Sequence, residues 1–293
     1  MASEFKWVRS IFGKGENASK QYNHIPSKGM NEVIKHWQDK QPEREFTCAT
    51  PSRLTQCPRS VWLQVHGVPR TEDMTWAVKQ RMMLGRQLED MFAMQLEDEG
   101  VLLHHWKDNE GDIVAKFVSG EGTSRLEGVP DYILDLNGKA TVSDAKTSRS
   151  DSFGYVPLEA PEIWEDGGWS KYKVQVEAYY KLMLDNKEQL AGLGIPVPEQ
   201  CHLFSYALDD GIVRREIIWT PTKADLDRVG YYTERFNRAM IAKTAPACTC
   251  ADTPDGFEVK FCPYGIKEEG DKVATSCCHD DLIEIALKKG IKE

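Results

Sequence analysis

The residues best suited to chemistry lie on one short segment, which reads VPDYILDLNGKATVSDAK. Asp131 precedes a first apolar run at 132–136, and a second run at 140–142 leads into Asp144 and Lys146. The two runs are joined by Asn-Gly, which predicts a β-hairpin. Because residues two apart on a strand share a face, Asp144 and Lys146 should point the same way, with Asp131 beside them. Two carboxylates and an amine around one point suit a Mg²⁺ ion and an activated water.

Three further side chains lie on helices that could face this hairpin. A helix is predicted over about 75–98, where Glu89 borders an apolar stripe made of Leu84, Leu88, Met91 and Phe92. A second helix is predicted over about 171–185, with Ser170 as its cap. In that helix, Gln175 and Tyr179 are four residues apart and share one face. All three side chains therefore become candidates for the same site.

The other elements predict an α/β fold with a mixed central sheet flanked by helices. A helix over about 52–66 is indicated by Ser/Thr caps and by proline in the first turn. Strands are expected at 113–118, then at 202–208 and 212–220, the last two joined by Asp-Asp-Gly. A helix over 222–242 should end the core.

The chain divides into three parts. Residues 1–47 are polar and irregular and form an N-terminal arm or appendage. Residues 48–245 hold the predicted core, and residues 246–293 form a cysteine-rich segment that should pack on it. A loop over 148–168, rich in Gly, Pro, Ser and acidic residues, could close over a site.

Composition narrows the class of protein. The 293 residues are 41% hydrophobic and 28% charged, as in ordinary globular proteins. No apolar run has the length of a membrane span and no secretory signal is visible, so we expect a soluble cytoplasmic protein. The net charge is −9, yet residues 1–60 hold ten Lys/Arg against six Asp/Glu, which favours an arm near a polyanion. No P-loop motif is present.

The cysteines indicate a metal site. Five of the eight fall between Cys248 and Cys278. An intracellular chain seldom uses such residues as a disulfide framework, so metal ligation is the first interpretation. The tail carries a C-x-C pair and a C-C pair, which are weaker metal signals than C-x-x-C.

Read in order, these pieces resemble the PD-(D/E)XK nuclease superfamily, specifically its RecB-like exonuclease branch. That branch includes the nuclease domains of recombinational helicase-nucleases and the CRISPR-adaptation nucleases. The resemblance covers roughly 48–278 and is carried by Gly85-x-x-x-Glu89, Val129-Pro130-Asp131, Asp144-Ala145-Lys146 and Gln175-x-x-x-Tyr179. It implies a restriction-endonuclease-like mixed sheet flanked by helices.

The resemblance also implies roles for these residues. The ligands of a Mg²⁺ or Mn²⁺ ion would be Glu89, Asp131, Asp144 and the Ala145 carbonyl. Lys146 would orient the attacking water and help to deprotonate it, while Gln175 and Tyr179 would hold the scissile strand or the geometry of the site. The side chains that could line the path of the nucleic acid are Arg53, Arg59, Lys171 and Lys173.

Iron–sulfur members of the family place one cysteine before the Gly-x-x-x-Glu helix and three near the C-terminus. Cys57 matches the first position, and the others would be Cys250, Cys262 and Cys278, with Cys248 and Cys277 as alternates. Four thiolates suit a [4Fe–4S] cluster, which the resemblance favours, or a structural Zn²⁺ ion. Either group would tie the N-terminal and C-terminal parts of the chain together.

The resemblance therefore predicts a metal-dependent DNA exonuclease, active in end processing, recombination, repair or phage DNA metabolism. Its partner would be DNA with a free end, together with a separate helicase, recombinase or annealing protein. Such a stand-alone nuclease also suits a bacteriophage. Two alternatives stay open: a structure- or sequence-specific endonuclease, and a non-catalytic module that binds DNA or protein. A third reading takes the cysteine tail itself as the functional part, as in a zinc-stabilised adaptor.

Overall fold

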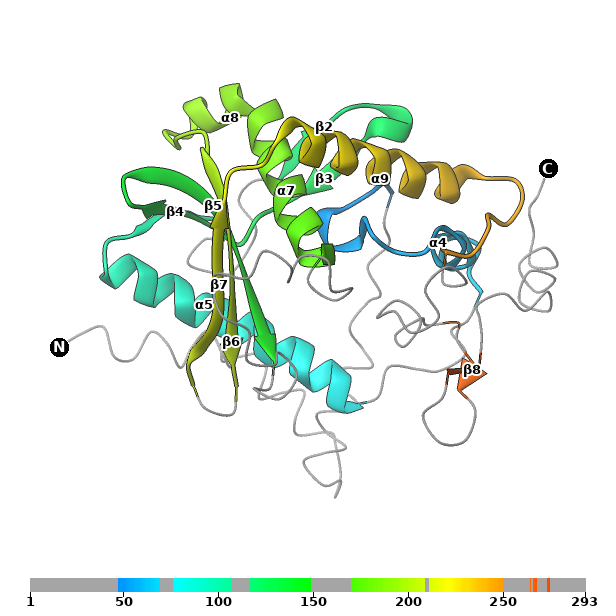
Figure 1. Cartoon of the computed structure of the whole chain (residues 1–293), viewed down its shortest axis with the longest axis horizontal. Coiled ribbons are helices and arrows are strands. Elements are labelled where there is room, and N and C mark those ends of the chain that lie inside the picture. The colour runs from blue at the N-terminus through cyan, green and yellow to red at the C-terminus, as the bar shows by residue number, and fades with distance from the viewer. Residues whose placement is uncertain are drawn as a thin grey trace, which may run out of the picture.

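A five-stranded mixed sheet forms the centre of the protein (Figure 1). The computed structural model describes residues 47–68, 76–106, 116–148, 170–208 and 211–249, with short pieces at 264, 266–267 and 273–274. The strands lie in the order β1 (Leu102–His105), β4 (Tyr132–Leu136), β5 (Lys139–Ser148), β6 (Gln200–Ala207) and β7 (Val213–Trp219). The β5–β6 pair is parallel and the other neighbours are antiparallel. The predicted α/β class with a mixed sheet is confirmed.

The predicted hairpin is the β4–β5 pair. Asn137 and Gly138 both have positive φ, 57° and 76°, which is the conformation of a type I′ turn. The Gly138 N–H donates a 2.8 Å hydrogen bond to Oδ1 of Asp135 and closes the turn. Strand β5 is longer than the apolar run alone indicated, because it continues through Asp144 and Lys146. Both side chains therefore stand on regular backbone in the middle of the sheet.

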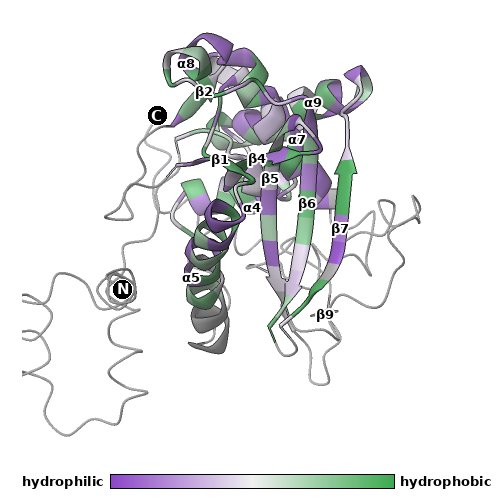
Figure 2. Cartoon of the chain, turned by 90° about the vertical axis from the view of Figure 1, so that its left-hand side faces the viewer, coloured by the Kyte–Doolittle hydropathy of each residue, from purple (hydrophilic) through white to green (hydrophobic). Residues whose placement is uncertain are grey.

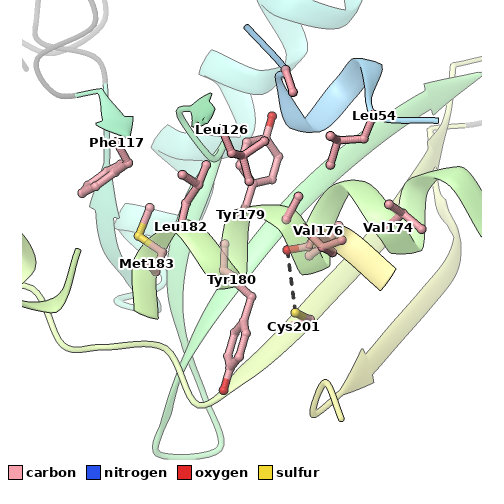
Figure 3. Packing of buried hydrophobic residues seen from close by; sticks show 14 of the residues in the cluster. Leu54, Phe117, Leu126, Val174, Val176, Tyr179, Tyr180, Leu182, Met183 and Cys201 are labelled. Carbon is pink, nitrogen blue, oxygen red and sulfur yellow. Dashed lines mark hydrogen bonds between the residues drawn. The ribbon is translucent and has the colours of Figure 1, made fainter. Parts of the chain in front are cut away.

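Helices cover both faces of the sheet. α7 (Ser170–Asp185) and α9 (Lys223–Ile241) belong to one apolar cluster, whose members include Ile133, Val142, Val174, Val176, Leu182, Leu203, Val229 and Phe236. Figure 3 shows α7 side chains of this cluster, with Val176 beside Cys201 of β6. α5 (Trp76–Asp98) covers the opposite face through a cluster that includes Phe92, Ala93, Tyr132, Leu134, Ala145 and Phe204. The helices at 75–98, 171–185 and 222–242 are confirmed to within a residue or so at each end.

The predicted helix over 52–66 is wrong in its first half. The structure has a 3₁₀ turn η1 (Pro51–Arg53) and then a shorter helix α4 (Pro58–Val65). Cys57 adopts φ −56° and ψ 127°, because a residue before proline disfavours the helical region. α4 packs against α9, and Trp62 Nε1 donates a 2.8 Å hydrogen bond to the carbonyl of Ala242.

β1, a fifth strand of the sheet, and α8 (Lys187–Gly192), which follows α7, were not predicted from the sequence. The strand predicted at 113–118 overlaps β2 (Phe117–Ser119), and its first residues, 113–115, lie outside the described residues. β2 pairs with β3 (Leu126–Gly128) apart from the main sheet, around the turn η2 (Gly122–Ser124). Two short strands, β8 (Ile266–Lys267) and β9 (Val273–Ala274), pair near the C-terminus. Among the helices described, none is long and apolar enough to span a membrane.

Candidate active site

The hairpin places Asp131 against strand β5. Asp131 stands directly before β4, whose first residue pairs in register with Ser143. The backbone N–H of Ala145 donates a 3.0 Å hydrogen bond to Oδ2 of Asp131. The carboxylate is thus fixed next to the strand that carries Asp144 and Lys146, as the sequence predicted.

Asp144 is held from two directions. Its side chain is 1% exposed, and Oδ2 forms an ion pair with the Lys146 ammonium group. Oδ1 accepts a 2.9 Å hydrogen bond from Nε2 of Gln175 on α7. A buried carboxylate is strongly stabilised only when it is paired and hydrogen-bonded, and Asp144 has both kinds of contact.

Gln175 and Tyr179 face the strand together. Gln175 Nε2 lies 3.5 Å from the Tyr179 hydroxyl oxygen. Burial and then the charge of Asp144 raise the pKa of Tyr179, so the phenol stays protonated over the whole physiological range. The predicted helical face therefore does reach the carboxylates.

Glu89 approaches from the opposite side of the sheet. Its backbone carbonyl accepts a 2.7 Å hydrogen bond from the Tyr132 hydroxyl, which anchors α5 to the first residue of β4. Burial, and then the charges of Asp144 and Glu89, raise the pKa of Asp131 well above its usual range, against the smaller opposing effects of Lys146 and the Ala145 N–H. Three acidic groups therefore crowd one region, which a bound cation would relieve.

The ammonium group of Lys146 contacts both the carboxylate of Asp144 and the aromatic ring of Tyr172. Burial works against its charge, but Asp144 and Asp131 outweigh this and raise the pKa of the amine. Its Nζ lies 5.3 Å from the ring centroid of Tyr172, and the Nζ of Lys171 lies 4.6 Å from the same centroid. Sequence reasoning missed Tyr172. The available signal was its position three residues before Gln175 on the same helix.

The oxygen atoms of the site suit a metal that is only partly enclosed by protein. Within the described ranges, no group of three or more His, Cys, Asp or Glu side chains is arranged to hold a metal ion. Asp131 and Asp144 nevertheless supply two carboxylates side by side. Mg²⁺ commonly binds through one or two carboxylates and completes its shell with water and substrate phosphate. The residues therefore fit a Mg²⁺ or Mn²⁺ ion of this kind.

The four basic residues predicted to line a nucleic-acid path differ in their surroundings. Lys173 is 16% exposed and binds the chain's own Glu177 and Asp225. Arg59 donates a 2.8 Å hydrogen bond from Nε to the carbonyl of Pro246. Arg53 is the last residue of the turn η1. Lys171 lies over the Tyr172 ring, which Lys146 also contacts.

The cysteine prediction is covered only in part by the described residues. Cys57 Sγ lies 3.7 Å from Cys248 Sγ, although the two residues are far apart in the sequence. Cys57 caps α4, and Cys248 follows α9, which packs on α4. The other candidates lie outside the described residues and are Cys250, Cys262, Cys277 and Cys278. Cys248, proposed only as an alternate, is the residue found beside Cys57.

Comparison with known proteins adds little about function. No protein-family model matches the chain. No curated protein matches it either. Among solved structures, the chain is similar to the crystal structure of SSO0001, with a TM-score of 0.43 and 16% identity over 80% of this chain and 94% of that one. At that TM-score the likeness carries no functional argument.

Proposed function

We propose that this chain is a metal-dependent nuclease that hydrolyses phosphodiester bonds in DNA. The observation that carries the proposal is the meeting of Asp131, Asp144 and Lys146 on one hairpin, with Asp144 bound by Gln175. Two carboxylates can bind a dication, and an amine beside them can contact the attacked phosphate.

The chain's own residues divide this work. Asp131 and Asp144 would hold a Mg²⁺ or Mn²⁺ ion, with the Ala145 carbonyl and Glu89 contributing oxygen or binding a water. The ion, when bound, supplies positive charge to the phosphate and lowers the pKa of a water molecule. Lys146 would hold that water and the phosphate by hydrogen bonds from its ammonium group. Gln175 and Tyr179 would keep Asp144 in the orientation that the ion needs.

Exonuclease action on free DNA ends is the finer proposal, and it rests on the resemblance described above. A separate helicase, recombinase or annealing protein would supply or receive the ends. End-labelled linear DNA and closed circular DNA, each with Mg²⁺ or Mn²⁺ and with an EDTA control, separate the cases. Loss of linear DNA alone supports an exonuclease. Cutting of circles would instead show an endonuclease, and binding without cleavage would show a non-catalytic module.

Matched variants connect this activity to the site. Asp131→Asn and Lys146→Ala should abolish cleavage in the same assay. Asp135→Asn is the control, because Asp135 lies on the same hairpin with an exposed side chain that only caps the turn. Cleavage that survives Asp131→Asn would place the active site elsewhere.

A thiolate metal site is the second part of the proposal. The 3.7 Å separation of the Cys57 and Cys248 sulfurs supports shared ligation of one group. A tetrahedral Zn²⁺ ion with Zn–S bonds of about 2.3 Å holds its sulfurs about 3.8 Å apart. In a [4Fe–4S] cluster each thiolate binds a different iron, so the sulfurs lie further apart. The spacing thus favours zinc, while the family resemblance favours iron–sulfur, and metal analysis decides between them.

A further inference from the structure

Two tyrosine rings and one arginine gather on the outer part of α9. The ring centroids of Tyr231 and Tyr232 lie 5.6 Å apart, with an angle of 63° between the ring planes. The guanidinium carbon of Arg235 lies 4.6 Å from the centroid of Tyr232 and 6.0 Å from that of Tyr231. Arg235 follows the two tyrosines by one helical turn, so the helix itself brings the three side chains together. We refer to these three residues as the Tyr–Arg cluster.

The cluster presents one ring to solvent and fixes the other two side chains. Tyr231 is 63% exposed, whereas Tyr232 is partly buried against the main apolar cluster of the protein. Arg235 lies 3.5 Å from the carbonyl of Gln56, to which it donates a long hydrogen bond. Among the described residues, no carboxylate pairs with Arg235. The cluster therefore combines an accessible ring with a positive charge that no described acidic group neutralises.

The elements around the cluster are basic in a protein that is acidic overall. Residues 47–68, which include η1 and α4, contain two arginines and no Asp or Glu. Together with α9, which packs against α4, they hold six Lys/Arg against three Asp/Glu. Each of these three carboxylates is paired with a Lys or Arg side chain. The whole chain carries −9, so this local surplus of positive charge favours an anionic ligand at this surface.

The cluster stands on the helix next to the candidate active site. Figure 2 shows α9 beside α7, and the ion pair between Lys173 and Asp225 joins the two helices. Tyr172, whose ring lies beside Lys146, and Tyr232 both pack against the same apolar cluster. A ligand that extends from the active site over α7 therefore meets α9 as the next element.

We propose that Tyr231 stacks with a base of single-stranded DNA while Arg235 binds a neighbouring phosphate, outside the catalytic centre; this rests on the nuclease function proposed above. Aromatic rings stack with any base and cations follow the backbone, which is how proteins bind single strands without reading their sequence. Duplex DNA keeps its bases stacked on one another, so the exposed ring selects a single strand. A protein ligand would also use exposed rings, but the basic surroundings favour a polyanion.

The test uses the full-length protein with labelled single strands and the matching duplex. Binding is measured by fluorescence anisotropy without added divalent cations, and cleavage is measured with Mn²⁺. Tyr231→Ala should lower the affinity for single strands about 5- to 100-fold, and Tyr231→Phe, which keeps the ring, should bind like wild type. Tyr231→Ala should also raise KM while kcat stays unchanged, because the residue lies outside the catalytic centre.

Arg235→Gln tests the phosphate contact through its dependence on salt. Loss of one phosphate contact should reduce the slope of log affinity against log salt concentration by about 0.7 for a single strand. Lys187→Ala is the matched control, because it removes one exposed positive charge from α8. An Arg235→Gln slope equal to that of Lys187→Ala would remove Arg235 from the binding surface.

The decisive readout is non-additivity with strands that lack one base. Wild-type protein should lose affinity when one specific base is missing, and Tyr231→Ala should lose nothing more on that strand. On strands that lack any other base, Tyr231→Ala should show its full loss. Thermal melting shows that each variant is folded, and Tyr231→Ala with the abasic strands carries the test if Arg235→Gln is unstable.

Each other outcome has a definite meaning. Folded Tyr231→Ala protein that binds single strands like wild type would overturn the proposal and leave the exposed ring to a protein partner. Losses that multiply at every abasic position, or equal losses on the duplex, would also overturn it. The expected binding pattern without any cleavage by wild-type protein would refute the nuclease function and leave the base contact standing. Protein that neither binds nor cuts these strands would refute both.

Discussion

Gln175 Nε2 donates a 2.9 Å hydrogen bond to Oδ1 of Asp144, joining the helix α7 to the buried carboxylate on β5. The other oxygen of Asp144 is paired with Lys146. The amide thereby selects which oxygen of the carboxylate faces the ammonium group. Removing a side chain that orients a metal ligand commonly lowers metal affinity or activity by roughly 10- to 100-fold.

Gln175→Ala should therefore lower cleavage about 10- to 100-fold and raise the Mn²⁺ concentration needed for half-maximal rate. Titrating Mn²⁺ against the initial rate checks this. Gln189→Ala on α8, where the side chain is exposed, is the matched control. An unchanged Mn²⁺ requirement in the Gln175→Ala protein would show that Gln175 does not orient a metal ligand.

Gly85 allows α5 to approach β5 closely. A Cβ at this position would lie 3.1 Å from Oγ1 of Thr147. Gly230, in the middle of α9, has open space around it. Alanine in a helix interior is favoured over glycine by about 1 kcal/mol, so Gly230→Ala should raise the melting temperature.

Gly85→Ala should gain less stability than Gly230→Ala. It should also lower cleavage, because it displaces Glu89, which lies one turn after Gly85 on α5. Thr147→Ala, combined with Gly85→Ala, removes the contacted oxygen and should restore both properties. Thermal melting and the nuclease assay check the pair. Equal gains from the two single alanine variants would show that α5 is not held close to β5 at Gly85.

Asp225 carries a pH-dependent part of the stability. Burial works against its charge, but hydrogen bonds from Lys173 and from Thr222 outweigh burial and hold the pKa well below its usual range. A carboxyl with a depressed pKa stabilises the folded state above its unfolded pKa of about 3.9, and that contribution is lost as the pH falls. Lys173 and Arg228 also pair with the buried Glu177, so the network is mostly shielded from water.

Asp225→Asn should lower the free energy of unfolding by about 1.5–3 kcal/mol at neutral pH. The difference from wild type should shrink as the pH drops below about 4, because Asp225 of the unfolded wild-type chain then takes up a proton while the folded carboxylate stays charged. Urea unfolding between pH 3 and pH 7 measures this difference in the free energy of unfolding. Asp227→Asn, on the same helix with a side chain 65% exposed, should show a far smaller effect. A constant difference at all pH values would contradict the ion-pair explanation.

Cys57 and Cys248 are both expected to be ligands of one bound metal group. Protein purified without chelators should contain iron or zinc, and Cys57→Ser or Cys248→Ser should each lower the metal content and the melting temperature. Elemental analysis and visible absorption identify the metal. Cys201→Ala is the control, since Cys201 is buried between β6 and α7. Metal-free wild-type protein with a Cys57–Cys248 disulfide, seen by mass spectrometry, would exclude a thiolate site.

The sequence predicted the parts of this site that depend on local pattern. Asn-Gly defined the turn, and alternation then placed Asp144 with Lys146. The four-residue spacing of Gln175 and Tyr179 predicted their shared face. In each of these cases the geometry is determined within one element or one tight turn.

The parts that could not be predicted depend on pairing between distant segments. Glu177 lies four residues after Lys173 on the same helix, but nothing in the sequence near Lys173 shows that the distant Asp225 will also pair with it. The alignment of Lys146 with Ser205, and of Ser205 with Arg215, depends on two strand registers, one of them shifted by a bulge. α4 illustrates a different difficulty: Pro51 and Pro58 both carry a helix-start signal, and only the conformation of Cys57 separates them.

The single parallel pairing in the sheet has a consequence for the order of folding. β4 and β5 are joined by a two-residue turn and can pair within microseconds, whereas β5 and β6 meet only after the crossover through α7 and α8 has closed. A partly folded chain would therefore hold Asp131 against Ala145 before Gln175 reached Asp144. Recovery of the proposed nuclease activity during refolding should then lag behind formation of the hairpin, and the lag would measure how long the second half of the sheet takes to dock.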